Sequence, residues 1–147
     1  MERRRDGGFT LVEMLAVVVI IAVLAAMVVP RFAGRSEEAR RSAASADIQA
    51  NLAGALDLFE LDNGFYPTTA QGLEALRTEP AVAPMPPRWK GPYIKKRGAL
   101  NDPWGRPYVY AAPGAHNEKD YDLSSSGADG APDTPDDITN WSGDDPS

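Results

Sequence analysis

An apolar run near the amino terminus constrains this chain more than any other part of its sequence. Residues 14–29 contain no charged side chain, and across residues 9–29 the only polar side chains are Thr10 and Glu13. A helix over residues 9–29 would be about 31 Å long, which matches the hydrocarbon core of a bilayer. Three arginines at positions 3–5 precede the run. We therefore expect a single membrane span whose amino-terminal end stays in the cytoplasm while the rest of the chain is exported.

Glu13 is the exception within this run. A carboxylate in an apolar span is costly unless it is paired, and such residues are often functional. It could lie at headgroup level and be hydrated, since residues 14–29 offer no positive partner. A cut between Gly8 and Phe9 would create an α-amino group at the start of the helix. Within one helix that amine is poorly placed for Glu13, so a neighbouring copy of the chain is the better partner.

The stretch Gly8-Phe9-Thr10-Leu11-Val12-Glu13 resembles the prepilin peptidase site of type IV pilins and pseudopilins. The resemblance implies that the leader at residues 1–8 is removed after Gly8, that the new amino-terminal Phe9 is methylated, and that Glu13 serves assembly. An ordinary secretory signal or an uncleaved anchor also begins with basic residues before an apolar run. The run is longer than a usual signal peptide core, and no clear small-residue cleavage site follows it.

Beyond the apolar run, apolar side chains continue at helical spacing as far as Phe59. This pattern predicts one long helix from about Phe9 to Asp62. Pro30 should kink or loosen that helix near the membrane exit. Asn63-Gly64 is a helix stop.

The second half of the chain predicts short elements around loops. Thr68 and Gln71 fit a capping box that starts a short helix ending near Leu76. The prolines of residues 80–92 favour an irregular loop, which we expect Trp89 to pack. Three strands of an antiparallel sheet are expected to cover the helix face from Ile48 to Phe59, at residues 93–95, 108–110 and 121–123.

Several blocks together resemble a narrower branch of this family, the major pseudopilins of type II secretion. The blocks are Asn63-Gly64-Phe65-Tyr66-Pro67-Thr68-Thr69, Gln71-Gly72-Leu73, Gly91-Pro92-Tyr93-Ile94-Lys95, Asp102-Pro103-Trp104-Gly105, Pro107-Tyr108 and Gly127-Ala128-Asp129-Gly130. The resemblance implies an α+β fold: a pilin-like long N-terminal helix, membrane-spanning in its first half, packed on a small antiparallel β-sheet with a calcium-binding C-terminal loop. It also implies a periplasmic globular domain at residues 30–147.

Residues 124–137 form an oxygen-rich loop with the turn residues glycine and proline. Such side chains suit a hard cation such as calcium. Taken alone, the loop is more typical of a solvated acidic surface, and its spacing is not that of an EF-hand. The resemblance implies a calcium site, in a loop that is shorter than is usual in the family. The implied ligands, the firmest first, are Asp129 with the Ser126 carbonyl, then Asp136, then Asp133 and Asp137.

Charge and composition exclude several functions. From residue 117 onward there are nine acidic residues against Lys119, which is unsuited to nucleic acid. The chain has no cysteine, so a disulfide cannot hold the exported domain, and a metal could take that role. The lone His116 has no partner pattern for a transition metal or catalysis. We expect no enzymatic activity, and we expect the basic residues between Arg88 and Arg106 to form a solvated face or a contact with an acidic tail in a filament.

The implied function is that of the major subunit of the type II secretion pseudopilus. By resemblance, the chain would polymerise into a periplasmic filament that helps drive folded exoproteins through the outer membrane. The implied partners are other copies of the chain, minor pseudopilins, prepilin peptidase and the inner-membrane assembly platform. Two alternatives stay open: a type IV pilin for motility, adhesion or DNA uptake, and a membrane-anchored calcium-binding module that never polymerises.

Overall fold

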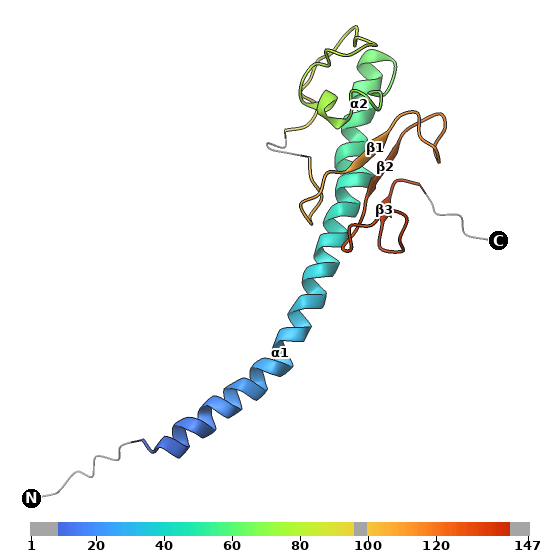
Figure 1. The fold of residues 1–147 in the computed structure, drawn as a ribbon. Coiled ribbons are helices and arrows are strands. Elements are labelled where there is room, and N and C mark those ends of the chain that lie inside the picture. The colour runs from blue at the N-terminus through green and yellow to red at the C-terminus, as the bar shows by residue number, and fades with distance from the viewer. Residues whose placement is uncertain (1–8, 96–99, 142–147) are drawn as a thin grey trace, which may run out of the picture. The chain divides into compact units, whose positions relative to one another are not determined.

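The chain forms a long helical segment and a small mixed domain (Figure 1). This computed structural model describes residues 9–95 and 100–141, without the side chains of residues 27–33. Two compact units are present, Met1–Glu38 and Ala39–Ser147. We describe each unit by itself.

Helix α1 spans Leu11–Ala46. It begins where Thr10 caps it, because the Glu13 N–H donates to the Thr10 hydroxyl over 3.2 Å. The predicted start at Phe9 is therefore two residues early. Position 30 lies inside α1, so its proline does not end the helix. Apolar side chains within residues 11–26 are exposed in the single chain.

The predicted long helix is interrupted by a wider turn. A π-helix covers Asp47–Leu52, and α2 follows at Ala53–Asn63. The π-helix sends its two large apolar side chains, Ile48 and Leu52, into the core. Two of its polar side chains bind distant segments. Asp47 accepts a hydrogen bond from the hydroxyl of Tyr108, just before β1, over 2.9 Å, and the Gln49 amide donates to the Thr139 carbonyl over 2.9 Å. Sequence periodicity misses this change because one extra residue in a turn hardly alters the apolar spacing.

The predicted helix end at Gly64 and the predicted capping box after it are confirmed. Gly64 ends α2 in the left-handed conformation, with φ of 83°, and its N–H donates to the Glu60 carbonyl over 2.6 Å. Thr68 and Gln71 form the capping box, since each backbone N–H donates to the other's side chain, over 3.0 and 3.3 Å. The element that follows is a short 3₁₀ helix, Leu73–Leu76.

The sheet has three antiparallel strands in the order β1-β2-β3: Val109–Ala111, Asp122–Ser125 and Ile138–Thr139. Tyr110 lies opposite Leu123, and Ser125 lies opposite Ile138. The first two strands agree with the predicted ones within two residues, whereas β3 was not expected.

The strand predicted at residues 93–95 is wrong. The N–H groups of Tyr93 and Ile94 both donate to the single carbonyl of Leu76, over 2.7 and 3.4 Å, so this segment docks on the 3₁₀ helix instead of joining a ladder. The Trp89 indole N–H donates to the Ala75 carbonyl over 3.0 Å, which confirms that Trp89 packs the proline-rich loop.

One hydrophobic core lies between the helix and the sheet. Leu56, Phe59 and Leu123 are fully buried within it. The other buried members are Ile48, Leu52, Ala55, Leu73, Ala75, Leu76, Tyr108 and Tyr121. The sheet thus covers the predicted helix face. The expected combination of a long helix and a small antiparallel sheet is confirmed.

Candidate functional sites

The amino-terminal candidate residues lie at the start of α1. Phe9 is exposed and precedes the helix, and Glu13 lies exposed in the first turn. An acidic side chain there is favoured by the positive end of the helix dipole. Gly8 and the rest of the predicted leader lie outside the described residues. Among the described residues, no helix combines the length and the apolar character that crossing a membrane requires.

The acidic candidate residues share one loop, residues 126–137, which connects β2 to β3. Because these strands pair, the two ends of the loop are held together. The Gly130 N–H donates to the Ser126 carbonyl over 3.0 Å and closes a tight turn. Asp129 and Asp133 are exposed, whereas Asp136 is partly buried. A solvent cation can therefore reach the loop.

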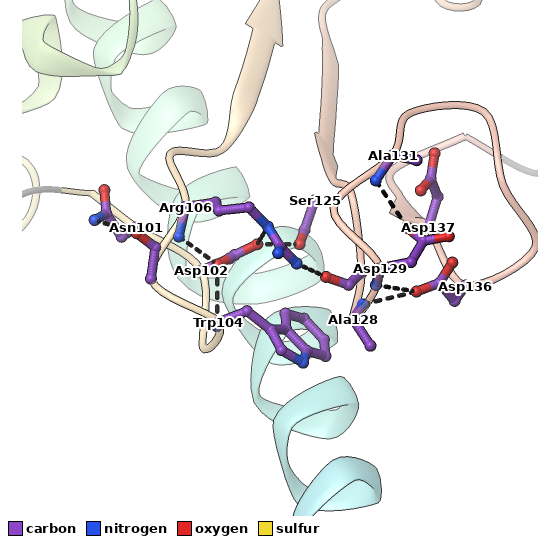
Figure 2. A network of polar contacts seen from close by, with 12 residues as sticks. Asn101, Asp102, Trp104, Arg106, Ser125, Ala128, Asp129, Ala131, Asp136 and Asp137 are labelled. Carbon is purple, nitrogen blue, oxygen red and sulfur yellow. Dashed lines mark hydrogen bonds and ion pairs between the residues drawn. The ribbon is translucent and has the colours of Figure 1, made fainter.

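Asp136 closes the loop from its far end. One carboxylate oxygen, Oδ2, accepts hydrogen bonds from the N–H groups of Ala128 and Asp129, over 2.7 and 3.1 Å (Figure 2). The other oxygen accepts the Thr134 hydroxyl over 2.6 Å. The Thr134 hydroxyl and then the Asp129 N–H, against a smaller opposing effect of burial, lower the pKa of Asp136 to about 2. This carboxylate is thus ionised throughout the physiological range.

Three carboxylates converge on the Thr134 hydroxyl. Its oxygen lies 2.6 Å from Asp136 Oδ1, 3.3 Å from Asp137 Oδ1 and 3.4 Å from Asp129 Oδ1. The Ala131 carbonyl lies 3.2 Å away as well. A hydroxyl has one proton to donate, so it can satisfy only one of these four acceptors at a time. The centre of the loop therefore holds more negative charge than its own donors neutralise.

This loop fits a hard cation in its chemistry. It offers carboxylate, hydroxyl and carbonyl oxygens, the ligand types that calcium takes, and residues 126–137 include four aspartates and no basic residue. The geometry differs from the expected site in one respect. Across residues 9–95 and 100–141, no three His, Cys, Asp or Glu side chains are arranged to hold a metal ion. Asp129 and Asp137 also accept the N–H groups of Ala131 and Asp133, each over 2.8 Å.

The structure thus brings Ser126, Asp129, Asp136 and Asp137 together in one closed loop. Asp133 lies beside them with its backbone in the left-handed region, at φ of 63°. Its contribution to the loop is the N–H that it donates to Asp137.

Next to the loop lies a buried carboxylate that sequence reasoning passed over. The Asp102 side chain is fully buried and accepts three hydrogen bonds: from the N–H groups of Trp104 and Arg106, over 3.0 and 2.8 Å, and from the Ser125 hydroxyl, over 2.6 Å. Arg106 Nε lies 4.0 Å from the Asp102 carboxylate (Figure 2). The Asp-Pro-Trp-Gly turn was the available signal, since Asp at such a turn often binds N–H groups further along the chain. Its link to Ser125 depends on the tertiary fold.

A second carboxylate organises the hairpin before β2. Asp122 accepts the N–H groups of Ala115, His116 and Asn117, over 2.7, 2.9 and 2.9 Å. Burial raises the pKa of Asp122, but these hydrogen bonds, with that from the His116 ring, outweigh it and leave the pKa below its usual value. The His116 ring stacks on Trp141 at a centroid distance of 4.2 Å. His116 therefore has a structural partner on each side.

Among the described basic residues between Arg88 and Arg106, Arg88, Lys90 and Lys95 are exposed and Arg106 is partly buried. Lys90 binds Asp62 over 2.6 Å, and Arg106 reaches inward to the loop. Lys96 and Arg97 lie outside the described residues.

Two models of known protein families match this chain. Residues 31–141 match the family described as type II secretion system (T2SS), protein G, and residues 3–29 match the prokaryotic N-terminal methylation motif. The chain is similar to the type II secretion system core protein G of Pseudomonas aeruginosa, with 48% identity over 143 residues that cover 96% of this chain and 99% of that protein. It is 50% identical to the core protein G of Escherichia coli over 138 residues, which cover 93% of this chain and 92% of that protein.

A solved structure is similar as well. The crystal structure of the major pseudopilin from the type 2 secretion system of enterohaemorrhagic Escherichia coli matches with a TM-score of 0.63 and 41% identity. The match covers 74% of this chain and 87% of that chain.

Proposed function

The chain belongs to the protein G family of type II secretion and is a pseudopilus subunit, and from this premise we propose that it is the major structural subunit, polymerising into a periplasmic filament that helps drive folded exoproteins through the outer membrane. The observation that carries the proposal is the family match over residues 31–141, together with relatives that are similar over nearly their full length. Assembly with other components of the secretion system follows from membership. The specific partners that we propose are minor pseudopilins and the inner-membrane assembly platform.

The proposed processing converts residues 1–8 into a removed leader. Prepilin peptidase would cut between Gly8 and Phe9, and the new amino group of Phe9 would be methylated. The match to the N-terminal methylation motif over residues 3–29 supports this proposal. Because Thr10 caps α1, Phe9 lies just outside the helix, where a new terminus needs no unwinding.

Glu13 is the proposed assembly residue. Its carboxylate would pair with the amino group of Phe9 in a neighbouring copy, which sets the register between subunits as the apolar helices bundle. The pair would be formed away from water, where an unpaired carboxylate is costly. Residues 9–29 are the proposed single span of the inner membrane before assembly, and residues 30–147 the periplasmic part. The support is the methylation motif and the lack of charge across residues 14–29.

Calcium is the proposed ligand of the loop at residues 126–137. The carboxylates of Asp129, Asp136 and Asp137 and the Ser126 carbonyl are the groups proposed to hold it, with Asp133 as a further candidate. The convergence of three carboxylates on the Thr134 hydroxyl supports the proposal, because a bound cation would neutralise charge that one proton cannot. When bound, calcium would supply a cross-link between the two ends of the loop. Adding a chelator to purified protein should lower its melting temperature, and an unchanged melting temperature would reject the site.

We further propose that the chain catalyses nothing, since its family is structural.

The central test of the proposed processing is the intact mass of the full chain from cells with and without prepilin peptidase. A peptidase-dependent mass equal to residues 9–147 plus one methyl group is expected. A full-length mass in both strains would refute the processing proposal.

A deletion strain separates the two machines that such a subunit could serve. Loss of exoprotein secretion with normal surface motility, restored by the wild-type gene but not by Glu13→Ala, is the expected result. Normal secretion with lost motility would favour a type IV pilin instead.

A further inference from the structure

Arg106 joins the buried Asp102 to the acidic loop. Its backbone N–H donates to Asp102 Oδ1 over 2.8 Å, and its Nε lies 4.0 Å from Asp102 Oδ2. The far end of the guanidinium donates to the Gly127 carbonyl, inside the loop (Figure 2). One side chain therefore contacts both the Asp-Pro-Trp-Gly turn and the backbone of the loop at residues 126–137.

The loop backbone packs closely around this contact. A Cβ atom added to Gly130 would lie 2.7 Å from Arg106 Nη1, and one added to Gly127 would lie 2.3 Å from the Asp136 carbonyl oxygen. Both glycines have positive φ, of 74° and 55°. The sequence Gly127-Ala128-Asp129-Gly130 thus lets the backbone press against the guanidinium on one side and against Asp136 on the other. A Cβ atom at Gly127 would meet the backbone of Asp136, and one at Gly130 would meet the end of the Arg106 side chain.

The charge of Arg106 is largely offset before it reaches the loop. The Asp102 carboxylate is fully buried beside it, whereas the Arg106 side chain is 36% exposed. Within the described residues, the contacts of Arg106 with the loop go to backbone groups and not to Asp129, Asp136 or Asp137. The guanidinium therefore contacts the backbone of the loop without binding any of its three clustered carboxylates.

We propose that Arg106 is the positioning residue of the cation-binding loop. It holds the loop backbone at Gly127 and Gly130 so that the carboxylates stay clustered before calcium arrives. The inference rests on the calcium site proposed above. A positioning role and a charge effect predict opposite changes in calcium affinity when Arg106 is replaced. If Arg106 acted by charge alone, it would repel calcium, and its removal would tighten binding. If Arg106 positions the loop, its removal weakens binding.

The test is titration of the full chain in detergent with calcium chloride, followed by calorimetry. Arg106→Gln should bind calcium about tenfold more weakly, the effect of losing one charge-assisted hydrogen bond. Arg106→Lys, which keeps the charge but not the fork of donors, should fall between Arg106→Gln and wild type. Lys90→Gln is the matched control, because it removes one positive charge from an exposed pair with Asp62. It should bind as wild type does.

Equal or tighter calcium binding by Arg106→Gln would overturn the proposal while leaving the calcium site intact. The proposal would also be overturned if Arg106→Gln melted at a lower temperature than wild type in chelator but bound calcium with unchanged affinity. That result would describe a purely structural residue. Failure of the wild-type chain to bind calcium would overturn both proposals. Should Arg106→Gln not fold, Arg106→Lys is the second variant, because it keeps the charge and loses the fork of donors. Weaker calcium binding by that variant supports the positioning role, and wild-type binding refutes it.

Discussion

Replacing Asp102 should destabilise the globular unit more than any exposed acidic residue does. The Asp102 side chain is fully buried and accepts the N–H groups of Trp104 and Arg106 and the hydroxyl of Ser125. Asp102→Ala leaves all three donors without this acceptor. Because Ser125 is itself fully buried, water cannot replace the lost partner at its hydroxyl.

The magnitude follows from these contacts. Three hydrogen bonds at about 1 kcal/mol each give about 3 kcal/mol, and the ion pair with the partly exposed Arg106 adds less than about 1 kcal/mol. We therefore expect Asp102→Ala to lower the free energy of unfolding by about 3–4 kcal/mol. Asp102→Asn keeps an oxygen for the two backbone N–H groups and should cost about 1–2 kcal/mol. Ser125→Ala removes one hydrogen bond and should cost about 1 kcal/mol.

Near-ultraviolet circular dichroism of the full chain in detergent is the suitable assay. All three tryptophans lie within Ala39–Ser147, so the signal reports this unit and not the apolar helix. A loss of 3–4 kcal/mol corresponds to a fall in melting temperature of roughly 15 °C. Ser125→Ala should cost about 1 kcal/mol less in the Asp102→Ala background than in wild type. Additive effects of the two substitutions, or an Asp102→Ala cost below about 1 kcal/mol, would refute the network.

Three further measurements test other parts of the fold. Leu123→Ala, at a fully buried core position, should lower the free energy of unfolding by about 2–5 kcal/mol in a urea titration. Gly64→Ala should lower the free energy of unfolding by about 1 kcal/mol because φ is 83° there. Gly54→Ala, with open space inside α2, should raise it by about 0.5–1 kcal/mol. A change of the same sign in both variants would contradict the assigned helix end. Asp136 and Asp122 both have lowered pKa values, so their stabilisation is present above the unfolded pKa of about 4 and is lost as pH falls towards 2. Acid titration should therefore lower the free energy of unfolding over this range, and Asp136→Asn should flatten the profile; an unaltered profile would reject that assignment.

Local signals in the sequence predicted the helical part of this fold well. Apolar spacing, the Asn63-Gly64 stop and the capping box of Thr68 with Gln71 each depend on residues a few positions apart. The geometry of these features therefore depends on residues that are close in sequence, and the structure agrees with the predictions. The π-helix at Asp47–Leu52 was not predicted because its stabilising partners, such as Tyr108, are distant in sequence.

The sheet and the loops were harder to predict for the same reason. Residues 93–95 have the composition of a strand, yet the N–H groups of Tyr93 and Ile94 find a partner in the Leu76 carbonyl. Strand β3 contains two residues, too few for a recognisable alternation. The oxygen-rich segment predicted at residues 124–137 is a loop from residue 126 onward, but neither the central position of the Thr134 hydroxyl nor the contact from Arg106 was predicted. The role of a polar side chain here depends on which backbone groups the fold leaves unpaired.

The acidic residues of the second half of the chain therefore have a structural role that composition conceals. The strands are two to four residues long and the chain has no cysteine, so neither a long ladder nor a disulfide can fix the connections. Three aspartates take that role by accepting backbone N–H groups of the segments around them: Asp102 in the turn before β1, Asp122 at the start of β2 and Asp136 before β3. Asp122 and Asp136 have lowered pKa values, so their hydrogen bonds stabilise the fold most above the unfolded pKa of about 4, which links this part of the domain to pH. Asp136 also adds its negative charge to the loop at residues 126–137, so a side chain that organises the backbone there also raises the attraction of the loop for a divalent cation.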